Sequence, residues 1–169
     1  LLDLMTIKRE KGDFKDLKVV MVGDVKNSRI AHSSIWGLLK LGSKVSVTGP
    51  STLIPLELKN FGVDIYYNPV EAVRDADVII GLNIKSEESY KNSLPSYSEY
   101  KSMFKIDKTI LSYAKSDAIV IHPANSIRRD IEISSEIIES SKCFFNDQIS
   151  NGVAVRMALL YLLSLRGGE

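Results

Sequence analysis

Residues 17–29 read LKVVMVGDVKNSR, a short apolar run that ends in a glycine and a series of polar residues. The run from Leu17 to Val22 is nearly continuous and rich in valine, which is typical of a strand buried on both faces of a parallel sheet. From Ser28 to Lys40 the apolar side chains recur at helical spacing, and Gly42 follows the last of them. The stretch therefore predicts a strand, a tight turn and a helix, which together open an α/β unit.

The same alternation continues along the chain. Further strands are expected at Lys44–Thr48, Val63–Tyr67, Asp77–Leu82 and Ala118–Ile121. Helical segments are expected at residues 1–11, Pro55–Asn60, Val70–Arg74, Tyr100–Tyr113 and Phe144–Arg166. Residues 83–100 are polar and without a period, so they predict a long loop of the kind that often carries function. The pattern predicts an α/β fold, a doubly wound parallel sheet with helices on both faces, forming one domain over residues 1–169.

Bulk properties narrow the class of protein. The chain has 169 residues with 44% hydrophobic and 25% charged side chains, which fits one globular domain. A net charge of +1 gives no reason to expect nucleic acid or an acidic membrane surface as a partner. The apolar runs all fall short of the roughly 20 residues that span a bilayer.

The cysteine content and the first residues bear on compartment and completeness. The single cysteine, Cys143, cannot form an internal disulfide, which favours a reducing, cytoplasmic compartment. A buried structural cysteine is expected there rather than a catalytic thiol, because neither histidine is near it in sequence. Leu1 to Met5 lacks an initiator methionine, so we expect a longer natural polypeptide.

Candidate binding residues follow the predicted strands, because ligands of open α/β sheets bind at the carboxyl ends of the strands. Arg29 falls in the first turn of a helix, where the helix dipole disfavours a cation and favours an anion. It is interpreted either as a carboxylate-binding side chain or as a solvated partner of Asp24. His122 follows the last strand and is interpreted either as a hydrogen-bonding group of a site or as a structural residue closing the sheet. His32 is expected to be a packing residue.

The sequence lacks the motifs of dinucleotide binding, metal binding and serine-nucleophile catalysis. A dinucleotide site needs three glycines as GxGxxG, and only Gly23 is present at the first turn. The sequence has no His, Cys and carboxylate cluster at metal-ligand spacing and no GxSxG motif. Neither a cofactor nor a metal is expected.

Several segments together resemble the aspartate/ornithine transcarbamylase family. Residues 22–29 (VGDVKNSR) are similar to its GD-x-K-x-x-R stretch, and residues 1–7 (LLDLMTI) resemble the residues after its His-Pro-Thr-Gln segment. Residues 121–123 (IHP) with 129–133 (RDIEI) resemble its His-Pro loop, and Gln148 with 151–158 (NGVAVRMA) resembles its C-terminal helix. The motifs span the whole chain in the family's order and favour the aspartate branch.

The resemblance implies a function and a set of roles. Arg29 would bind the α-carboxylate of L-aspartate, and the loop of His122 and Pro123 would reach the carbamoyl group. Carbamoyl phosphate would be held by a separate domain with a Ser-x-Arg-Thr motif, toward which the first and last helices of this chain would pack. The full-length protein would be a homotrimer that makes N-carbamoyl-L-aspartate for pyrimidine biosynthesis. The chain alone would be inactive.

The sequence departs from the family pattern at two loops. Asn83 stands where the aspartate branch has an arginine, and Lys85 stands where it has a glutamine. Ala124 and Asn125 replace the second proline of the His-Pro loop, with one extra residue before Arg129. Substrate contacts are expected from these positions as well: Asn83, Lys85, Ala124, Asn125 and Arg129. Three interpretations are open: an aspartate enzyme, a transcarbamylase for another amine, and an inactive homologue with a structural or regulatory role.

Overall fold

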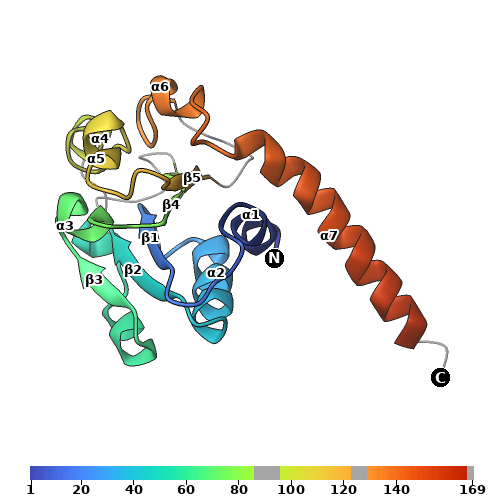
Figure 1. The fold of residues 1–169 in the computed structure, drawn as a ribbon. Helices are drawn as coiled ribbons and strands as arrows, with labels where there is room; N and C mark the ends of the chain where they lie inside the picture. Colours follow the sequence, from blue (N-terminus) through green and yellow to red (C-terminus); the bar gives the residue numbers. More distant parts are fainter. Residues whose placement is uncertain (86–95, 123–128, 167–169) are drawn as a thin grey trace.

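A five-stranded parallel sheet forms the centre of the computed structural model, which describes residues 1–85, 96–122 and 129–166 (Figure 1). The strand order is β3-β2-β1-β4-β5. The strands are β1 (Lys18–Val22), β2 (Lys44–Thr48), β3 (Asp64–Tyr66), β4 (Val78–Gly81) and β5 (Ile119–Ile121). All four pairings are parallel, which confirms the predicted fold class.

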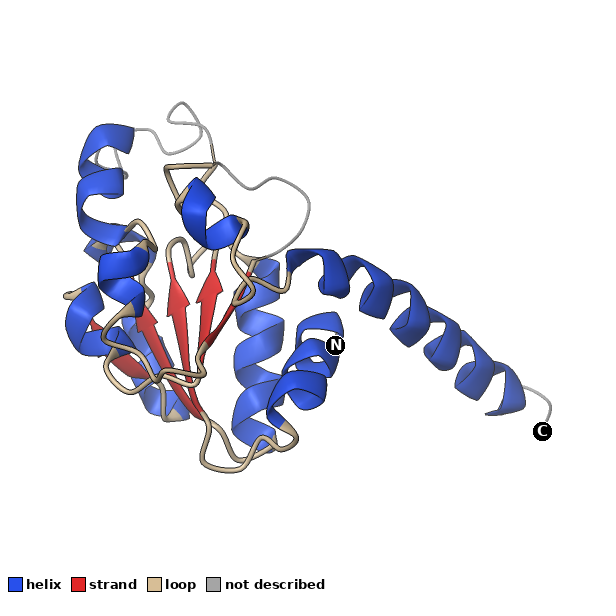
Figure 2. Cartoon of the chain, turned by 45° about the horizontal axis from the view of Figure 1, so that its top comes forward, coloured by secondary structure: helices blue, strands red, loops and turns tan. Residues whose placement is uncertain are grey.

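Helices connect the strands and cover both faces of the sheet (Figure 2). The α-helices are α1 (Leu2–Lys11), α2 (Arg29–Lys40), α3 (Pro69–Val73), α4 (Tyr97–Phe104), α5 (Lys108–Leu111), α6 (Ser135–Ile138) and α7 (Phe145–Arg166). Two 3₁₀ turns, η1 (Ser51–Leu53) and η2 (Leu56–Phe61), lie between β2 and β3.

The single helix predicted for Tyr100–Tyr113 is wrong, because the chain breaks it into α4 and α5. Between them, Ile106 is extended: its N–H donates to the carbonyl of Glu132 and its carbonyl accepts from Ser134, each at 2.9 Å. Asp107 then caps α5, since its carboxylate accepts from the main-chain N–H of Ile110 at 3.1 Å. A long-range bridge and a new cap therefore outweigh the helical pattern. The loop predicted for 83–100 is also shorter at its end, because α4 begins at Tyr97.

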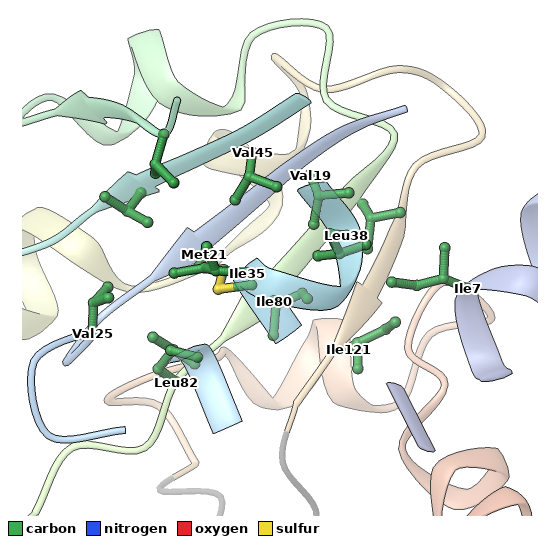
Figure 3. Packing of buried hydrophobic residues seen from close by; sticks show 14 of the residues in the cluster. Ile7, Val19, Met21, Val25, Ile35, Leu38, Val45, Ile80, Leu82 and Ile121 are labelled. Carbon is green, nitrogen blue, oxygen red and sulfur yellow. The ribbon is translucent and has the colours of Figure 1, made fainter. Parts of the chain in front are cut away.

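Alternate side chains of each strand build two separate apolar cores. In β1, Val19 and Met21 point toward α1 and α2, where they meet Ile35 and Leu38 (Figure 3). Their neighbours Val20 and Val22 point to the opposite face, which α3, α4, α5 and α6 cover. Because both of their faces are buried, β1, β4 and β5 are apolar at nearly every position.

The first and last helices pack against each other through buried polar side chains. Gln148 of α7 donates to the Asp3 carboxylate of α1 at 2.6 Å, and Asn151 donates to the Thr6 hydroxyl at 3.0 Å. Beyond this contact α7 projects from the body of the domain (Figure 1). Its projecting part exposes large apolar side chains: Val153, Met157, Leu159, Leu160, Tyr161, Leu162, Leu163 and Leu165. Within the described residues, no helix has the length and apolarity required to cross a membrane.

Candidate functional site

The strand order reverses between β1 and β4, which lie side by side at the middle of the sheet. From β1 the chain proceeds outward to β2 and β3, then returns to β4 on the other side of β1 and continues to β5. In open α/β sheets, ligands bind outside the carboxyl ends of the strands at such a reversal. The segments after β1 and β4 therefore flank the expected binding position, and the segment after β5 lies next to them.

The turn after β1 is built from its own side chains. The buried Asp24 carboxylate accepts hydrogen bonds from the main-chain and side-chain nitrogens of Asn27 at 3.0 to 3.1 Å. Ser28 caps α2, since its hydroxyl accepts from the N–H of Ala31 at 3.1 Å. These contacts fix the first residue of α2, Arg29, at the end of a rigid turn.

Arg29 lies at the surface at the N-terminus of α2. Its position there is the one the sequence predicts, with the helix dipole opposing its charge and favouring an anion nearby. A guanidinium can grip a carboxylate through two parallel hydrogen bonds. The Asp24 carboxylate is only 1% exposed and serves the turn through Asn27. Arg29 therefore offers its guanidinium at the surface, and its carboxylate-binding role remains a prediction.

The exit of β4 comes close to the end of β1 at Gly23. The φ of Gly23 is +126°, and a Cβ there would lie 3.0 Å from the carbonyl oxygen of Leu82 and 3.2 Å from the Tyr100 hydroxyl. Only glycine suits this conformation and this approach. After Leu82, the half-buried Asn83 and the exposed Lys85 bracket the buried Ile84. Asn83 and Lys85, two of the predicted substrate contacts, thus stand at the same edge of the sheet as Arg29.

His122 directly follows β5 and is fully buried. Its Nε2 lies 2.9 Å from Glu132 Oε2, and its main-chain N–H donates to the side-chain oxygen of Gln148 at 3.2 Å. The ring also packs over Gly81, where an added Cβ would lie 3.0 Å from His122 Cδ2. These contacts favour a structural role for the imidazole, one of the two that the sequence left open, and a role in the site remains a prediction. A substrate contact from this segment would have to come from its main chain or from the residues after it.

Three predicted residues of this segment, Pro123, Ala124 and Asn125, lie outside the described residues. Arg129, at the start of the next described range, is exposed and lies 3.5 Å from the carboxylate of Glu139, which is also exposed. Such a surface pair is weak and can exchange for another anion. The substrate-binding role of Arg129 remains a prediction.

A chain of hydrogen-bonded, buried polar groups connects the first and last helices with the exits of β4 and β5. It runs from Asp3 through Gln148 to His122, then to Glu132 and the main-chain N–H of Ile84. Burial raises the pKa of the Asp3 carboxyl above its ordinary value, although the hydrogen bond from Gln148 opposes this shift. Helices α1 and α7 are thereby linked to the exits of β4 and β5.

The described part of the chain contains no set of side chains suited to bind a metal ion. No group of three or more His, Cys, Asp or Glu side chains there could hold an ion. The cations at the edge of the sheet, Arg29 and Lys85, suit an anionic organic ligand instead.

The sequence of the chain matches one family profile over most of its length. The profile of the aspartate/ornithine carbamoyltransferase Asp/Orn-binding domain covers residues 15–163. The chain belongs to the aspartate/ornithine carbamoyltransferase family. Within that family, the matched part is the domain named for the amino-acid substrate.

Curated relatives of the chain are named as aspartate carbamoyltransferase catalytic subunits. The chain is 50% identical over 166 residues to the aspartate carbamoyltransferase catalytic subunit of Caldanaerobacter subterraneus, covering 98% of this chain and 54% of that protein. It is 49% identical over 166 residues to the same subunit of Acetivibrio thermocellus, covering 98% and 53%. The chain therefore spans about half the length of the curated relatives it matches.

Solved structures show the same fold. An ornithine carbamoyltransferase from Pyrococcus furiosus superimposes with a TM-score of 0.77 at 29% identity, covering 94% of this chain and 53% of that one. An ornithine carbamoyltransferase from Burkholderia thailandensis gives a TM-score of 0.76 at 20% identity, over 94% of this chain and 51% of its own, and shows the fold alone.

Sequence reasoning missed the part played by Glu132, which entered the sequence comparison only within the segment RDIEI. Its carboxylate is buried and contacts two of the three strand exits. The signal that could have found it is the acidic Glu132 between two apolar residues, Ile131 and Ile133. A charged residue is almost never fully buried without partners.

Proposed function

We propose that this chain is the L-aspartate-binding half of a carbamoyltransferase that makes N-carbamoyl-L-aspartate from carbamoyl phosphate and L-aspartate. The observation that carries the proposal is the place of Arg29. It stands at the carboxyl end of β1, beside the reversal of strand order, in a chain about 50% identical to aspartate carbamoyltransferase catalytic subunits. The full-length protein would be a cytoplasmic enzyme of pyrimidine biosynthesis. It would assemble as a homotrimer.

The residues at the sheet edge suggest how the chain would act. Arg29 would hold the α-carboxylate of aspartate, and Lys85 would supply a charge for the second carboxylate. The free amine would then attack the carbonyl carbon of carbamoyl phosphate. A C–N bond forms, the C–O bond to phosphate breaks, and the amine releases a proton. Holding the two substrates in reach is the main task of such a site, since no covalent nucleophile is needed.

The carbamoyl phosphate half would cover the projecting part of α7. Large apolar side chains of this part of α7 are exposed; Leu160, for example, is 70% exposed. A large contiguous apolar surface on a soluble protein usually marks an interface. The first helix, α1, is tied to α7 through Asp3 and would lie at the same boundary.

A second candidate is a transcarbamylase with another amine substrate. Asn83 and Lys85 favour it, because they change the loop that is expected to select the side chain of the substrate. An ammonium is a point charge and lacks the fork of a guanidinium, so selection of a second carboxylate by Lys85 would be less strict.

Turnover of the full-length polypeptide tests these candidates. Carbamoyl phosphate is supplied with L-aspartate or L-ornithine, and the carbamoylated product is measured. We expect N-carbamoyl-L-aspartate from the full-length protein and no turnover from residues 1–169 alone. Preferred carbamoylation of another amine would support the second candidate, and no turnover with any amine would leave the inactive homologue.

A further inference from the structure

The carboxylate of Glu132 joins the exits of two strands. Its Oε1 accepts from the main-chain N–H of Ile84 at 2.6 Å, just after β4. Its Oε2 lies 2.9 Å from Nε2 of His122, at the end of β5. Glu132 is 2% exposed, so both contacts are shielded from water.

The backbone around Glu132 holds the carboxylate in place. Its carbonyl accepts from the N–H of Ile106 at 2.9 Å, as part of the parallel bridge between Ile106 and Ile133. Just before it, Asp130 has a φ of +61°, and its N–H donates to the carbonyl of Ile133 at 2.8 Å, closing a tight turn. The Asp130 carboxylate also accepts from the N–H and hydroxyl of Ser135 at 3.0 and 2.9 Å. The turn directs the Glu132 side chain inward.

Other contacts also hold the two segments that Glu132 joins. His122 is held independently, by Gln148 at its N–H and by Gly81 beneath its ring. The segment after β4 is held by Glu132 at the Ile84 N–H and by Tyr97, whose hydroxyl donates to the carbonyl of Lys85 at 2.7 Å. Glu132 is therefore one of the ties that set this segment relative to the rest of the site.

A buried carboxylate is an unfavourable choice for stability alone. Its desolvation cost is offset only when its oxygens find good donors, and an apolar replacement often serves a core equally well. Here the donors are the main chain beside Asn83 and Lys85 and the imidazole of His122. Glu132 thus contributes more to the geometry of the segments after β4 and β5 than to the stability of the core.

We propose that Glu132 is a positioning residue that fixes Asn83 and Lys85 against the end of β5 and thereby sets the affinity for the amino-acid substrate. This inference rests on the proposed function of the site. It predicts that weakening Glu132 acts chiefly on the amino acid, because His122 keeps its contacts with Gln148 and Gly81 and the other half of the protein would hold the phosphate of carbamoyl phosphate.

The test uses Glu132→Gln in the full-length polypeptide, with Glu136→Gln as the matched control. Glu136 is an exposed residue of α6 that pairs with Lys108. A neutral amide oxygen is roughly half as strong an acceptor as a carboxylate, so the KM for L-aspartate should rise about tenfold. The KM for carbamoyl phosphate should stay within about twofold, and the control should change neither value.

Amide exchange supplies a readout that does not depend on activity. In the variant without substrate, the N–H of Ile84 should exchange about tenfold faster, while that of Val20 in the core of β1 should be unchanged. Uniformly faster exchange would overturn the proposal, since it indicates a general loss of stability. Faster exchange at Ile84 with an unchanged KM for the amino acid would overturn it too.

A different substrate or a folding defect would each call for a second comparison. If the wild type carbamoylates another amine, the proposed substrate is wrong, and the same KM comparison with that amine tests Glu132. If Glu132→Gln does not fold, Glu132→Asp replaces it, because aspartate keeps the charge but is one methylene too short to reach both partners. Failure of both variants to fold would overturn the proposal in favour of a purely structural role.

Discussion

Gly81 offers a direct test of how tightly the end of β4 is packed. A Cβ on this residue would lie 3.0 Å from His122 Cδ2, 3.2 Å from Ile133 Cδ1 and 3.3 Å from Ile106 Cδ1. All three neighbours are buried, and the His122 ring is tied to Glu132. The Gly81→Ala methyl can therefore be accommodated only if the core beside the site shifts.

Two opposing effects decide the magnitude. Overpacking a core by a methyl group costs about 1–3 kcal/mol. Replacing a strand glycine with alanine returns about 0.5–1 kcal/mol through the lower entropy of the unfolded chain. The net destabilisation should be about 1–2 kcal/mol, which lowers the melting temperature of a domain of this size by about 2–8 °C.

Gly152→Ala is the matched control because it makes the same chemical change in a helix. The nearest atom to a Cβ there is the flexible Arg156 side chain, 3.3 Å away. Alanine should stabilise α7 by about 0.5–1 kcal/mol. Urea unfolding of both variants measures the two effects. A Gly81→Ala protein as stable as the wild type would refute the packing described for the end of β4.

Three further perturbations act on contacts of the helices. Ser28→Ala removes the cap of α2 and should cost about 1 kcal/mol in urea unfolding, and a cost near zero would contradict the cap. Asp3→Asn keeps the acceptor for Gln148 and removes a carboxyl whose pKa burial raises above 3.8. Because the wild type takes up a proton on folding between pH 3.8 and that raised pKa, its stability gains as pH falls through this window. At pH 7 the variant should be more stable than the wild type, because it avoids the burial of this charge. Since it lacks the gain of the wild type at lower pH, this difference in stability should shrink toward pH 4, and a constant difference would contradict the assignment. Leu160→Asp should destabilise the full-length protein by about 1.5–3 kcal/mol but residues 1–169 by less than about 0.5 kcal/mol, and equal thermal shifts would contradict coverage of α7.

The strands were predictable because burial on both faces leaves a simple signal. The strand predicted for Lys44–Thr48 has the observed bounds, and that predicted for Leu17–Val22 differs by one residue. The order of the strands, and hence the reversal beside β1, could not be predicted, since it depends on which edges pair in space. The sequence pattern gives the elements, and the tertiary contacts give their arrangement.

The site was predictable where its geometry is local. Ser28 and Arg29 follow a strand directly, so the cap and the exposed arginine at the helix N-terminus could be inferred from neighbouring residues. Contacts between distant segments could not. The tie from Glu132 to Ile84 spans 48 positions, and that from Gln148 to Asp3 spans 145. The break between α4 and α5 was missed for the same reason, because its cause is the pairing of Ile106 with residues near 133.

The affinity of the full-length polypeptide for L-aspartate after Arg29→Ala tests the central claim most directly. The substitution removes one charge-assisted, bidentate contact worth about 1.5–3 kcal/mol, so the KM for L-aspartate should rise about ten- to a hundred-fold. The KM for carbamoyl phosphate and the melting temperature should barely change, because Arg29 is exposed and outside the core. An unchanged KM for L-aspartate in an active Arg29→Ala protein would contradict the assignment of the amino-acid site to the end of β1.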